Sequence, residues 1–219
     1  MSDAVDANEF IRANTKLLTP PLVPEIVLHL AEESLPIWQK TEEELGEMNL
    51  PPPFWAFAWA GGQALARYLL DNPELVAGKR VLDLGAGSGL TAIAAMKAGA
   101  ASVLAADIDR ISLASIAVNA TANDVAVATT GEDLLDDAPG DFGAVLIGDL
   151  FYERALAERA MAFIAKAETA GALILVGDPQ RSYFPKDRFV ALSDYRVPVT
   201  RELEDAEIKN SAVWQFSPR

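Results

Sequence analysis

The sequence predicts an α/β fold, a doubly wound and mostly parallel sheet with an antiparallel edge. Three observations lead to this prediction. A strand-like run over 81–84 ends in a glycine-rich turn, and a helical pattern opens near Leu90. From Arg80 onward, strand-like and helix-like stretches alternate, which is typical of βαβ units. Two strand-like stretches near the C-terminus have no clear helix between them, which indicates a closing hairpin.

The first 50 residues have a helical pattern without the β/α rhythm. We expect one helix from Asn8 to Leu18 and a second from about Glu25 to Glu33, separated by the proline-rich stretch 19–24. Pro24 suits the first turn of the second helix, where its missing N–H costs nothing. We therefore predict a helical N-terminal extension over residues 1–50 that packs on the sheet and helps to cover its ligand site.

The remaining residues carry the predicted elements of the sheet. A Gly-Gly pair at 61–62 opens a helix with Leu65, Leu69 and Leu70 on one face. Further helices are expected over 90–97, over 110–122 and around 156–167. The predicted strands lie at 80–84, 102–107, 125–130, 142–148, 172–176, 188–199 and 211–217.

A chain of 219 residues is most simply one domain, here an α/β core over 51–219 preceded by the extension. It contains no run of about 18 apolar residues, so we expect no membrane span. The first residues include Asp3, Asp6 and Glu9 among few basic side chains, unlike a signal peptide or an Arg-rich transit peptide. We therefore expect a cytoplasmic protein, with a processed organellar protein as the alternative.

The composition excludes several chemistries. The formal net charge of −14 repels phosphate backbones, so we expect no nucleic-acid partner. This charge would attract a basic protein surface or a cationic small molecule, but it is equally consistent with a role in solubility alone. The chain has no cysteine, and its single histidine, His29, lies in an apolar pattern that favours a structural role. We therefore expect neither a cysteine nucleophile nor a metal site.

The stretch Val81-Leu82-Asp83-Leu84-Gly85-Ala86-Gly87-Ser88-Gly89-Leu90 is a candidate ligand site. Leu90 stands where the dinucleotide fingerprint G-x-G-x-x-G needs its third glycine, which disfavours a NAD site. The alternative pattern, acidic-x-G-x-G-x-G, fits S-adenosylmethionine (AdoMet). The turn 85–89 and the helix end after it can receive the carboxylate of AdoMet, and Asp83 can pair with its ammonium. An ordinary tight turn is the alternative.

Asp107 ends the second predicted strand. In nucleoside-binding α/β sheets, an acid about 20 residues beyond the glycine turn accepts hydrogen bonds from ribose hydroxyls. We assign this role to Asp107, because Asp109 is the better cap for the helix that follows. Ile108 would then lie against the adenine. Glu132 and Asp133, after the third strand, are candidates for contact with the adenine amino group.

Four aromatic residues crowd into six positions just before the Gly-Gly pair. We assign Phe54 and Phe57 to the core. We assign Trp55 and Trp59 to the ligand site, because an aromatic face attracts a sulfonium cation and the glycines leave room for its methionine arm. The alternative is that all four pack in the core.

Asp149 ends the fourth predicted strand and begins the sequence Asp149-Leu150-Phe151-Tyr152. In such sheets, ligands bind beyond the carboxyl ends of the strands. A carboxylate at this point can grip and orient an amine for methyl transfer, and Tyr152 can supply an aromatic wall beside it. A helix cap is the alternative role for Asp149.

These motifs resemble a known family. The stretch from Val81 to Leu90, with Asp107-Ile108-Asp109, looks like a class I AdoMet-dependent methyltransferase. Further motifs narrow the resemblance, over roughly residues 50–185, to the lysine methyltransferases of the electron transfer flavoprotein beta subunit. These motifs are Pro53-Phe54-Trp55-Ala56, the turn from Trp59 to Gly62, Asp149-Leu150-Phe151-Tyr152 and Gly177-Asp178-Pro179.

The resemblance implies a Rossmann-like sheet of seven strands, AdoMet as methyl donor and S-adenosylhomocysteine as product. It implies a lysine ε-amino group as acceptor, with the electron transfer flavoprotein beta subunit as the suspected protein partner. A monomer and a bacterial form are expected, and Gln180 departs from the glycine of that family. Three alternatives stay open: a nicotinamide-like small-molecule N-methyltransferase, a ribosomal-protein lysine methyltransferase and a non-catalytic AdoMet-binding subunit.

Overall fold

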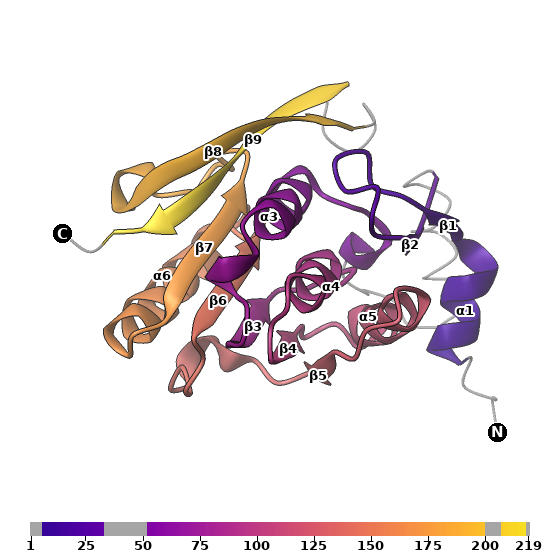
Figure 1. The fold of residues 1–219 in the computed structure, drawn as a ribbon, viewed down its shortest axis with the longest axis horizontal. Helices are drawn as coiled ribbons and strands as arrows, with labels where there is room; N and C mark the ends of the chain where they lie inside the picture. The colour runs from indigo at the N-terminus through magenta and orange to yellow at the C-terminus, as the bar shows by residue number, and fades with distance from the viewer. Residues whose placement is uncertain (1–5, 33–51, 200–206, 218–219) are drawn as a thin grey trace.

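A computed structural model describes residues 6–32, 52–199 and 207–217 of the chain. Its centre is a sheet with the strand order β5-β4-β3-β6-β7-β9-β8 (Figure 1). The first five strands in this order are parallel, and β9 runs antiparallel to both β7 and β8. This confirms the predicted sheet and its antiparallel edge. The strands are β3 (Arg80–Leu84), β4 (Ser102–Ala106), β5 (Ala128–Thr130), β6 (Ala144–Gly148), β7 (Leu173–Asp178), β8 (Phe189–Pro198) and β9 (Ile208–Phe216).

Helices cover both faces of this sheet (Figure 1). One face packs against α3 (Ala60–Asp71), α4 (Leu90–Lys97) and α5 (Arg110–Ala122), and the other against α6 (Arg154–Thr169). Because β6 is buried on both faces, its residues 144–147 form an unbroken apolar run. Short 3₁₀ turns complete the described helices: η1 (Phe54–Ala56), η2 (Pro73–Leu75), η3 (Leu134–Asp136) and η4 (Lys186–Arg188).

The predicted helices over 90–97 and 110–122 are confirmed, because each begins at a strong local signal. The carboxylate of Asp109 accepts hydrogen bonds from the N–H groups of Ile111 and Ser112 at 2.9 and 3.3 Å, which caps α5. The predicted third strand over 125–130 is too long, since β5 spans only 128–130. The Val125 N–H bonds instead to the Ala120 carbonyl, which closes the end of α5.

The N-terminal segment differs from the prediction. Helix α1 (Ala7–Asn14) ends before residue 18, and β1 (Lys16–Leu18) and β2 (Leu28–Leu30) form a separate two-stranded antiparallel sheet. The predicted second helix over 25–33 is therefore wrong. Leu28 and Leu30 are buried on either side of a half-buried His29, a period of two that a short apolar run does not distinguish from a helix.

Side chains of α5 and of its C-cap residue hold β2 and the residue before it in place. Asn119 accepts a hydrogen bond from the His29 N–H at 2.7 Å, and Asn123 bonds both the N–H and the carbonyl of Val27 at 3.0 and 2.6 Å. Nδ1 of His29 lies 3.1 Å from Oγ1 of Thr15, and burial lowers the pKa of this histidine. These partners are distant in sequence, so the local pattern did not reveal the strand. Residues 33–50 of the predicted extension lie outside the described residues.

The start of α3 crosses the end of β7 at two glycines. A Cβ on Gly61 would overlap the carbonyl oxygen of Gly177 and the carboxylate of Asp149. The next residue, Gly62, has room, because the nearest atom to a Cβ there is Cδ2 of Leu90 at 4.0 Å. This crossing sets the N-terminus of α3 directly against Asp149.

We expect Gly61→Ala to lower the free energy of unfolding by about 1–3 kcal/mol, because two backbone segments must separate to admit the methyl group. Gly62→Ala is the matched control. It should be neutral or stabilising by about 0.5–1 kcal/mol, since alanine is favoured over glycine inside a helix. Urea unfolding of the ligand-free variants measures both values, and equal midpoints would contradict this close crossing.

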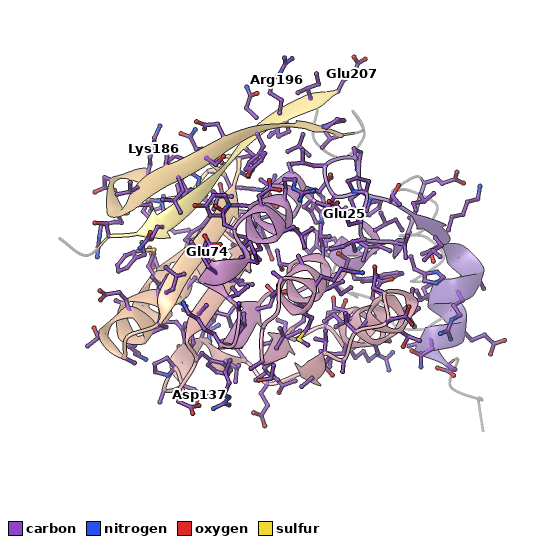
Figure 2. The ribbon with its side chains drawn as sticks, viewed as in Figure 1. Glu25, Glu74, Asp137, Lys186, Arg196 and Glu207 are labelled. Atoms are coloured by element: carbon purple, nitrogen blue, oxygen red, sulfur yellow. The ribbon has the colours of Figure 1, made fainter. Side chains whose placement is uncertain are left out.

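Several charged side chains lie on the outside of the fold. Figure 2 shows Lys186, Arg196 and Glu207 pointing away from the ribbon. No helix within residues 6–32, 52–199 and 207–217 is long and apolar enough to cross a membrane.

Candidate active site

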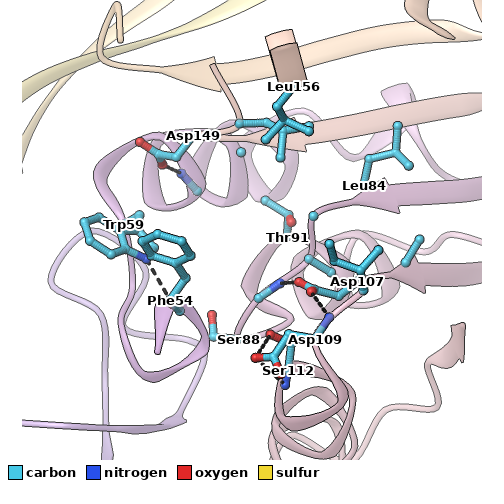
Figure 3. A pocket seen from close by; sticks show the side chains of 18 of the residues that line it. Phe54, Trp59, Leu84, Ser88, Thr91, Asp107, Asp109, Ser112, Asp149 and Leu156 are labelled. Carbon is cyan, nitrogen blue, oxygen red and sulfur yellow. Dashed lines mark hydrogen bonds between the residues drawn. The ribbon is translucent and has the colours of Figure 1, made fainter. Parts of the chain in front are cut away.

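A cavity of about 630 Å³ lies at the carboxyl ends of β3, β4 and β6 (Figure 3). Its wall is formed by the aromatic segment 52–62, the glycine turn after β3, the end of β4, the loop 132–135 and the segment after β6. Sites for drug-sized molecules and cofactors have volumes in this range. The cavity therefore stands where the topology of an open α/β sheet places a ligand.

The glycine turn forms the floor of this cavity. Gly85 and Gly87 have φ of +65° and +50°, a conformation that a side chain disfavours, and both line the cavity together with Ala86 and Ser88. Gly89 has φ of +79° and is the N-cap residue of α4, but it lies outside the cavity wall. The turn thus directs the N-terminus of α4 towards the space where a ligand binds.

Asp107 lies at the end of β4, beside the glycine turn. Its carboxylate accepts hydrogen bonds from the N–H groups of Gly87 at 2.8 Å and Asp109 at 3.0 Å (Figure 3). Burial raises its pKa. Ile108 is 75% exposed and lines the cavity, so its apolar side chain is accessible from the cavity. This arrangement suits a nucleoside whose ribose meets Asp107 and whose base lies on Ile108.

Asp83 lies behind the wall of the cavity. It is 1% exposed, and its Oδ2 accepts a hydrogen bond of 2.6 Å from the Thr91 hydroxyl, which does line the cavity. Its Oδ1 is buried and has no hydrogen-bond partner in the described part of the chain. Burial raises the pKa of Asp83 to about 7, although the bond from Thr91 opposes this shift.

The pKa of Asp83 predicts how the stability of the ligand-free protein depends on pH. An acid whose pKa is raised by folding stabilises the fold when protonated, so this stability is lost as pH rises from about 4 to about 7. Burial raises the pKa of Asp178 to about 7 as well, so it contributes in the same direction. We expect the free energy of unfolding to fall between pH 5 and pH 8, and to fall less in Asp83→Asn. Urea titrations at both pH values test this, and the same fall in both proteins would contradict it.

The aromatic segment divides differently from the prediction. Trp55 is fully buried, with its ring centroid 6.4 Å from that of Phe10, and it does not line the cavity. Phe54, Phe57 and Trp59 do line it. The 3₁₀ turn η1 rotates successive side chains to different sides, so Trp55 enters the core while Phe54 faces the cavity. Trp55 and Phe54 thus exchange their expected positions, whereas Phe57 lies in the core as predicted and also reaches the cavity wall.

Trp59 lies where the sequence pattern predicts it, at the cavity. Its indole N–H donates a 2.9 Å hydrogen bond to the Phe54 carbonyl (Figure 3). Its ring contacts those of Phe54 and Phe57, each with a centroid distance of 5.9 Å. Phe54 also contacts the ring of Tyr152 at 5.4 Å, and Tyr152 is 45% exposed. An aromatic wall therefore runs along one side of the cavity.

Asp149 lies beside this wall at the end of β6. It has φ of +54°, and its backbone N–H bonds the Gly177 carbonyl at 3.0 Å. Its carboxylate is 8% exposed and reaches the N-terminus of α3, where Oδ2 accepts a 2.9 Å hydrogen bond from the Gly62 N–H. The helix end favours negative charge at this point. Asp149 lines the cavity and does not cap α6, whose N-cap residue is Glu153.

Arg181 is a candidate site residue that the sequence does not indicate. Its Nη2 and Nε donate to Oδ1 of Asp149 at 2.6 and 2.9 Å, and its guanidinium lies 5.5 Å from the centroid of the Trp59 ring. It lines the cavity at the same place as both partners. The only sequence signal is its position after the fifth predicted strand, at the same sheet edge as Asp149.

Glu132 and Asp133 are exposed on the cavity wall. Asp133 caps η3 through the Leu135 N–H at 3.3 Å and forms an ion pair with Arg159 at 2.9 Å. Its carboxylate therefore already has protein partners, whereas Glu132 contributes its backbone N–H to the Thr130 hydroxyl at 3.2 Å. No cluster of potential metal ligands occurs in the described ranges.

Comparisons with known proteins agree with this geometry. A family model described as ribosomal protein L11 methyltransferase matches residues 63–145. The chain is 36% identical over 219 residues to the electron transfer flavoprotein beta subunit lysine methyltransferase of Danio rerio, covering 97% of this chain and 84% of that protein.

Solved structures share the fold. A protein of Thermoplasma acidophilum, 1320, aligns with a TM-score of 0.55 and 20% identity, over 72% of this chain and 90% of that chain. Magnesium protoporphyrin IX methyltransferase of Synechocystis PCC 6803, solved with bound S-adenosylhomocysteine, aligns with a TM-score of 0.53 and 16% identity, over 82% and 92%. At these identities the likeness concerns the fold.

The sheet, the glycine turn with an acid after the next strand, and the acid after β6 define a class I methyltransferase. Class I methyltransferases are AdoMet-dependent transferases with a Rossmann-like core. The identity to the zebrafish relative over nearly the whole chain then specifies the family. The chain belongs to the electron transfer flavoprotein beta subunit lysine methyltransferase family.

Proposed function

We propose that this chain transfers the methyl group of AdoMet to the ε-amino group of a lysine in the electron transfer flavoprotein beta subunit. The observation that carries the proposal is the carboxylate of Asp149, held at the carboxyl end of β6 against an aromatic wall. A carboxylate and aromatic rings together bind an amine and its methylated forms. A protein that only binds a nucleoside does not require this carboxylate and these aromatic rings at the end of β6.

The residues of the cavity fit AdoMet. The exposed N-terminus of α4 suits a carboxylate, and an ammonium that binds near Thr91 would favour the charged form of the Asp83 carboxyl behind it. Asp107 and Ile108 suit a ribose and an adenine. When bound, AdoMet supplies an electrophilic methyl group attached to a positively charged sulfur. Trp59 offers the aromatic face for this charge.

The acceptor nitrogen must present its lone pair in line with the bond between the methyl carbon and sulfur. As the nitrogen–carbon bond forms, the carbon–sulfur bond breaks and its electrons stay with sulfur, which leaves S-adenosylhomocysteine and a methylated amine. A lysine with pKa near 10.4 must first lose a proton to water, at a cost of about 4–5 kcal/mol at neutral pH. Asp149 orients the amine by hydrogen bonding, and Tyr152 forms the wall beside it.

The choice of acceptor protein rests on family and charge. Relatives with 34–37% identity carry the name of the electron transfer flavoprotein beta subunit lysine methyltransferase. The net charge of −14 favours a partner with a basic surface around the target lysine. The proposed substrate is therefore a lysine in a basic, accessible segment of the beta subunit.

Radiolabelled AdoMet tests this proposal directly. Purified enzyme is incubated with a bacterial extract and, separately, with purified electron transfer flavoprotein, and the products are resolved into protein bands and acid-soluble material. We expect label in a band of beta-subunit size, and mass spectrometry of that band should place the methyl groups on lysine. Asp149→Asn enzyme serves as the control for chemical labelling.

The other outcomes separate the alternatives. Label in a ribosomal-protein band, with none in the flavoprotein, would replace the acceptor and keep the reaction. Label only in acid-soluble material would assign a small-molecule acceptor. No transfer from AdoMet to either fraction would contradict the proposed reaction.

A further inference from the structure

We propose that Arg181 is a positioning residue that pairs with Asp149 and cancels its negative charge, so that the acceptor amine sheds its proton in the site. This inference rests on the proposed function. Asp149 alone would favour the protonated amine, because a carboxylate stabilises a neighbouring ammonium. The protonated amine has no lone pair and cannot accept a methyl group. A site that relies on Asp149 therefore needs a second charge to oppose this effect.

Hydrogen bonds of the neighbouring backbone fix the position of Arg181. Oδ1 of Asp178 accepts a 2.6 Å hydrogen bond from the Arg181 N–H, and Gln180 before it has φ of +63°. The Tyr183 N–H bonds the Phe151 carbonyl at 3.1 Å, which ties this loop to the segment of Asp149. The backbone on each side of Arg181 is thus fixed, and its side chain is only 18% exposed.

The guanidinium contacts Asp149, which orients the acceptor amine, and lies beside Trp59, which faces the methyl donor. It donates two hydrogen bonds to Oδ1 of Asp149 and lies over the ring of Trp59. Oδ2 of the same carboxylate faces the N-terminus of α3 through Gly62. Arg181 and the helix end therefore both place positive charge at Asp149. An amine that approaches this carboxylate therefore meets less negative charge than Asp149 alone would present.

Among the described residues, the other titratable groups near Asp149 add no second cation. Asp178, from β7, has a pKa raised to about 7 by burial, so it gains negative charge across the pH range of the test and adds to the charge that Arg181 opposes. Tyr152, on the segment of Asp149 itself, has a raised pKa and is neutral in the working range. From α3, the group that faces the carboxylate is a backbone N–H. Arg181 is thus the cation paired with this acid among the residues that the structure describes.

The pH dependence of turnover tests the inference. The turnover number and KM of wild type, Arg181→Gln and Arg181→Lys are measured from pH 6 to pH 10 with the acceptor that the wild type methylates. A unit charge several ångströms away, at an effective dielectric constant of about 20, moves a titration by about one to two pH units. In Arg181→Gln, we expect the acid limb of the pH profile of the turnover number to move to higher pH by this amount, with KM unchanged or lower. Arg181→Lys should return the acid limb most of the way to its wild-type position.

A matched control separates the effect of a charge beside Asp149 from the effect of the net charge of the protein. Arg80→Gln removes the same charge at the opposite end of β3, where Arg80 pairs with Asp141. It should leave the pH profile of the wild type unchanged. AdoMet affinity, measured by calorimetry, should stay within about threefold in every variant, since Arg181 faces the acceptor and not the glycine turn.

Two results would overturn the inference. Turnover reduced equally at every pH in Arg181→Gln would mean that the arginine only supports the loop. Turnover raised at every pH with a lower KM would mean that the guanidinium obstructs the amine. If the wild-type enzyme labels no protein lysine, the proposed function is refuted instead. The labelling assay with wild type shows this before any variant is compared.

Discussion

Asp149→Asn is expected to lower the turnover number by about 10²–10³-fold while the affinity for AdoMet changes by less than about threefold. The amide cannot hold an amine by charge, and it cannot keep the paired bonds from Arg181. The reacting nitrogen is then no longer oriented towards the methyl group. Methyl transfer to the acceptor protein and calorimetry with AdoMet measure the two quantities separately.

Asparagine is a better substitution here than most other residues, because it preserves the fold at this position. Residue 149 has φ of +54°, which asparagine tolerates better than most residues, and its side-chain oxygen still accepts the Gly62 N–H. Asp136→Asn is the matched control, since Asp136 pairs with Arg159 on the exposed loop and does not line the cavity. Asp149→Asn with wild-type turnover would reduce Asp149 to a structural role.

The parts of the fold that follow from sequence are those with local signals. α4 begins at a glycine turn and α5 at the cap Asp109, so both boundaries follow from a few adjacent residues. The pairing of β1 with β2 depends instead on Asn119 of α5 and on Asn123, the C-cap residue of that helix, which lie far along the chain. A three-residue strand has too few positions to show its period without these partners.

The residues of the candidate site also differ in whether a local sequence signal predicts them. Asp107 and Asp149 could be found because the carboxyl ends of parallel strands meet at one edge, and a strand end is visible in the sequence. The pairing of Arg181 with Asp149 joins two loops and depends on the crossing of α3 over β7. The inward turn of Trp55 depends on η1, a turn too short to have a pattern of its own. Such contacts appear only when the chain is folded.

Asp107→Ala is expected to weaken AdoMet binding by about 10²–10³-fold. Two consequences add: the ribose loses its charged acceptor, worth about 1.5–3 kcal/mol for each hydrogen bond, and the Gly87 N–H loses the carboxylate that fixes the glycine turn. Asp107→Asn keeps one acceptor oxygen and should give an intermediate loss. Calorimetric titration with AdoMet and with S-adenosylhomocysteine measures this, and both ligands should weaken equally because they share the nucleoside.

The control for this variant is Asp124→Asn, which removes one negative charge from an exposed residue outside the cavity. Asparagine is suited to the φ of +56° at that position, so the variant should bind AdoMet like the wild type. Raising AdoMet to saturation should restore turnover in Asp107→Ala but not in Asp149→Asn, because the first acid holds the donor and the second orients the acceptor. Near-normal AdoMet affinity in Asp107→Ala would remove Asp107 from the ribose site.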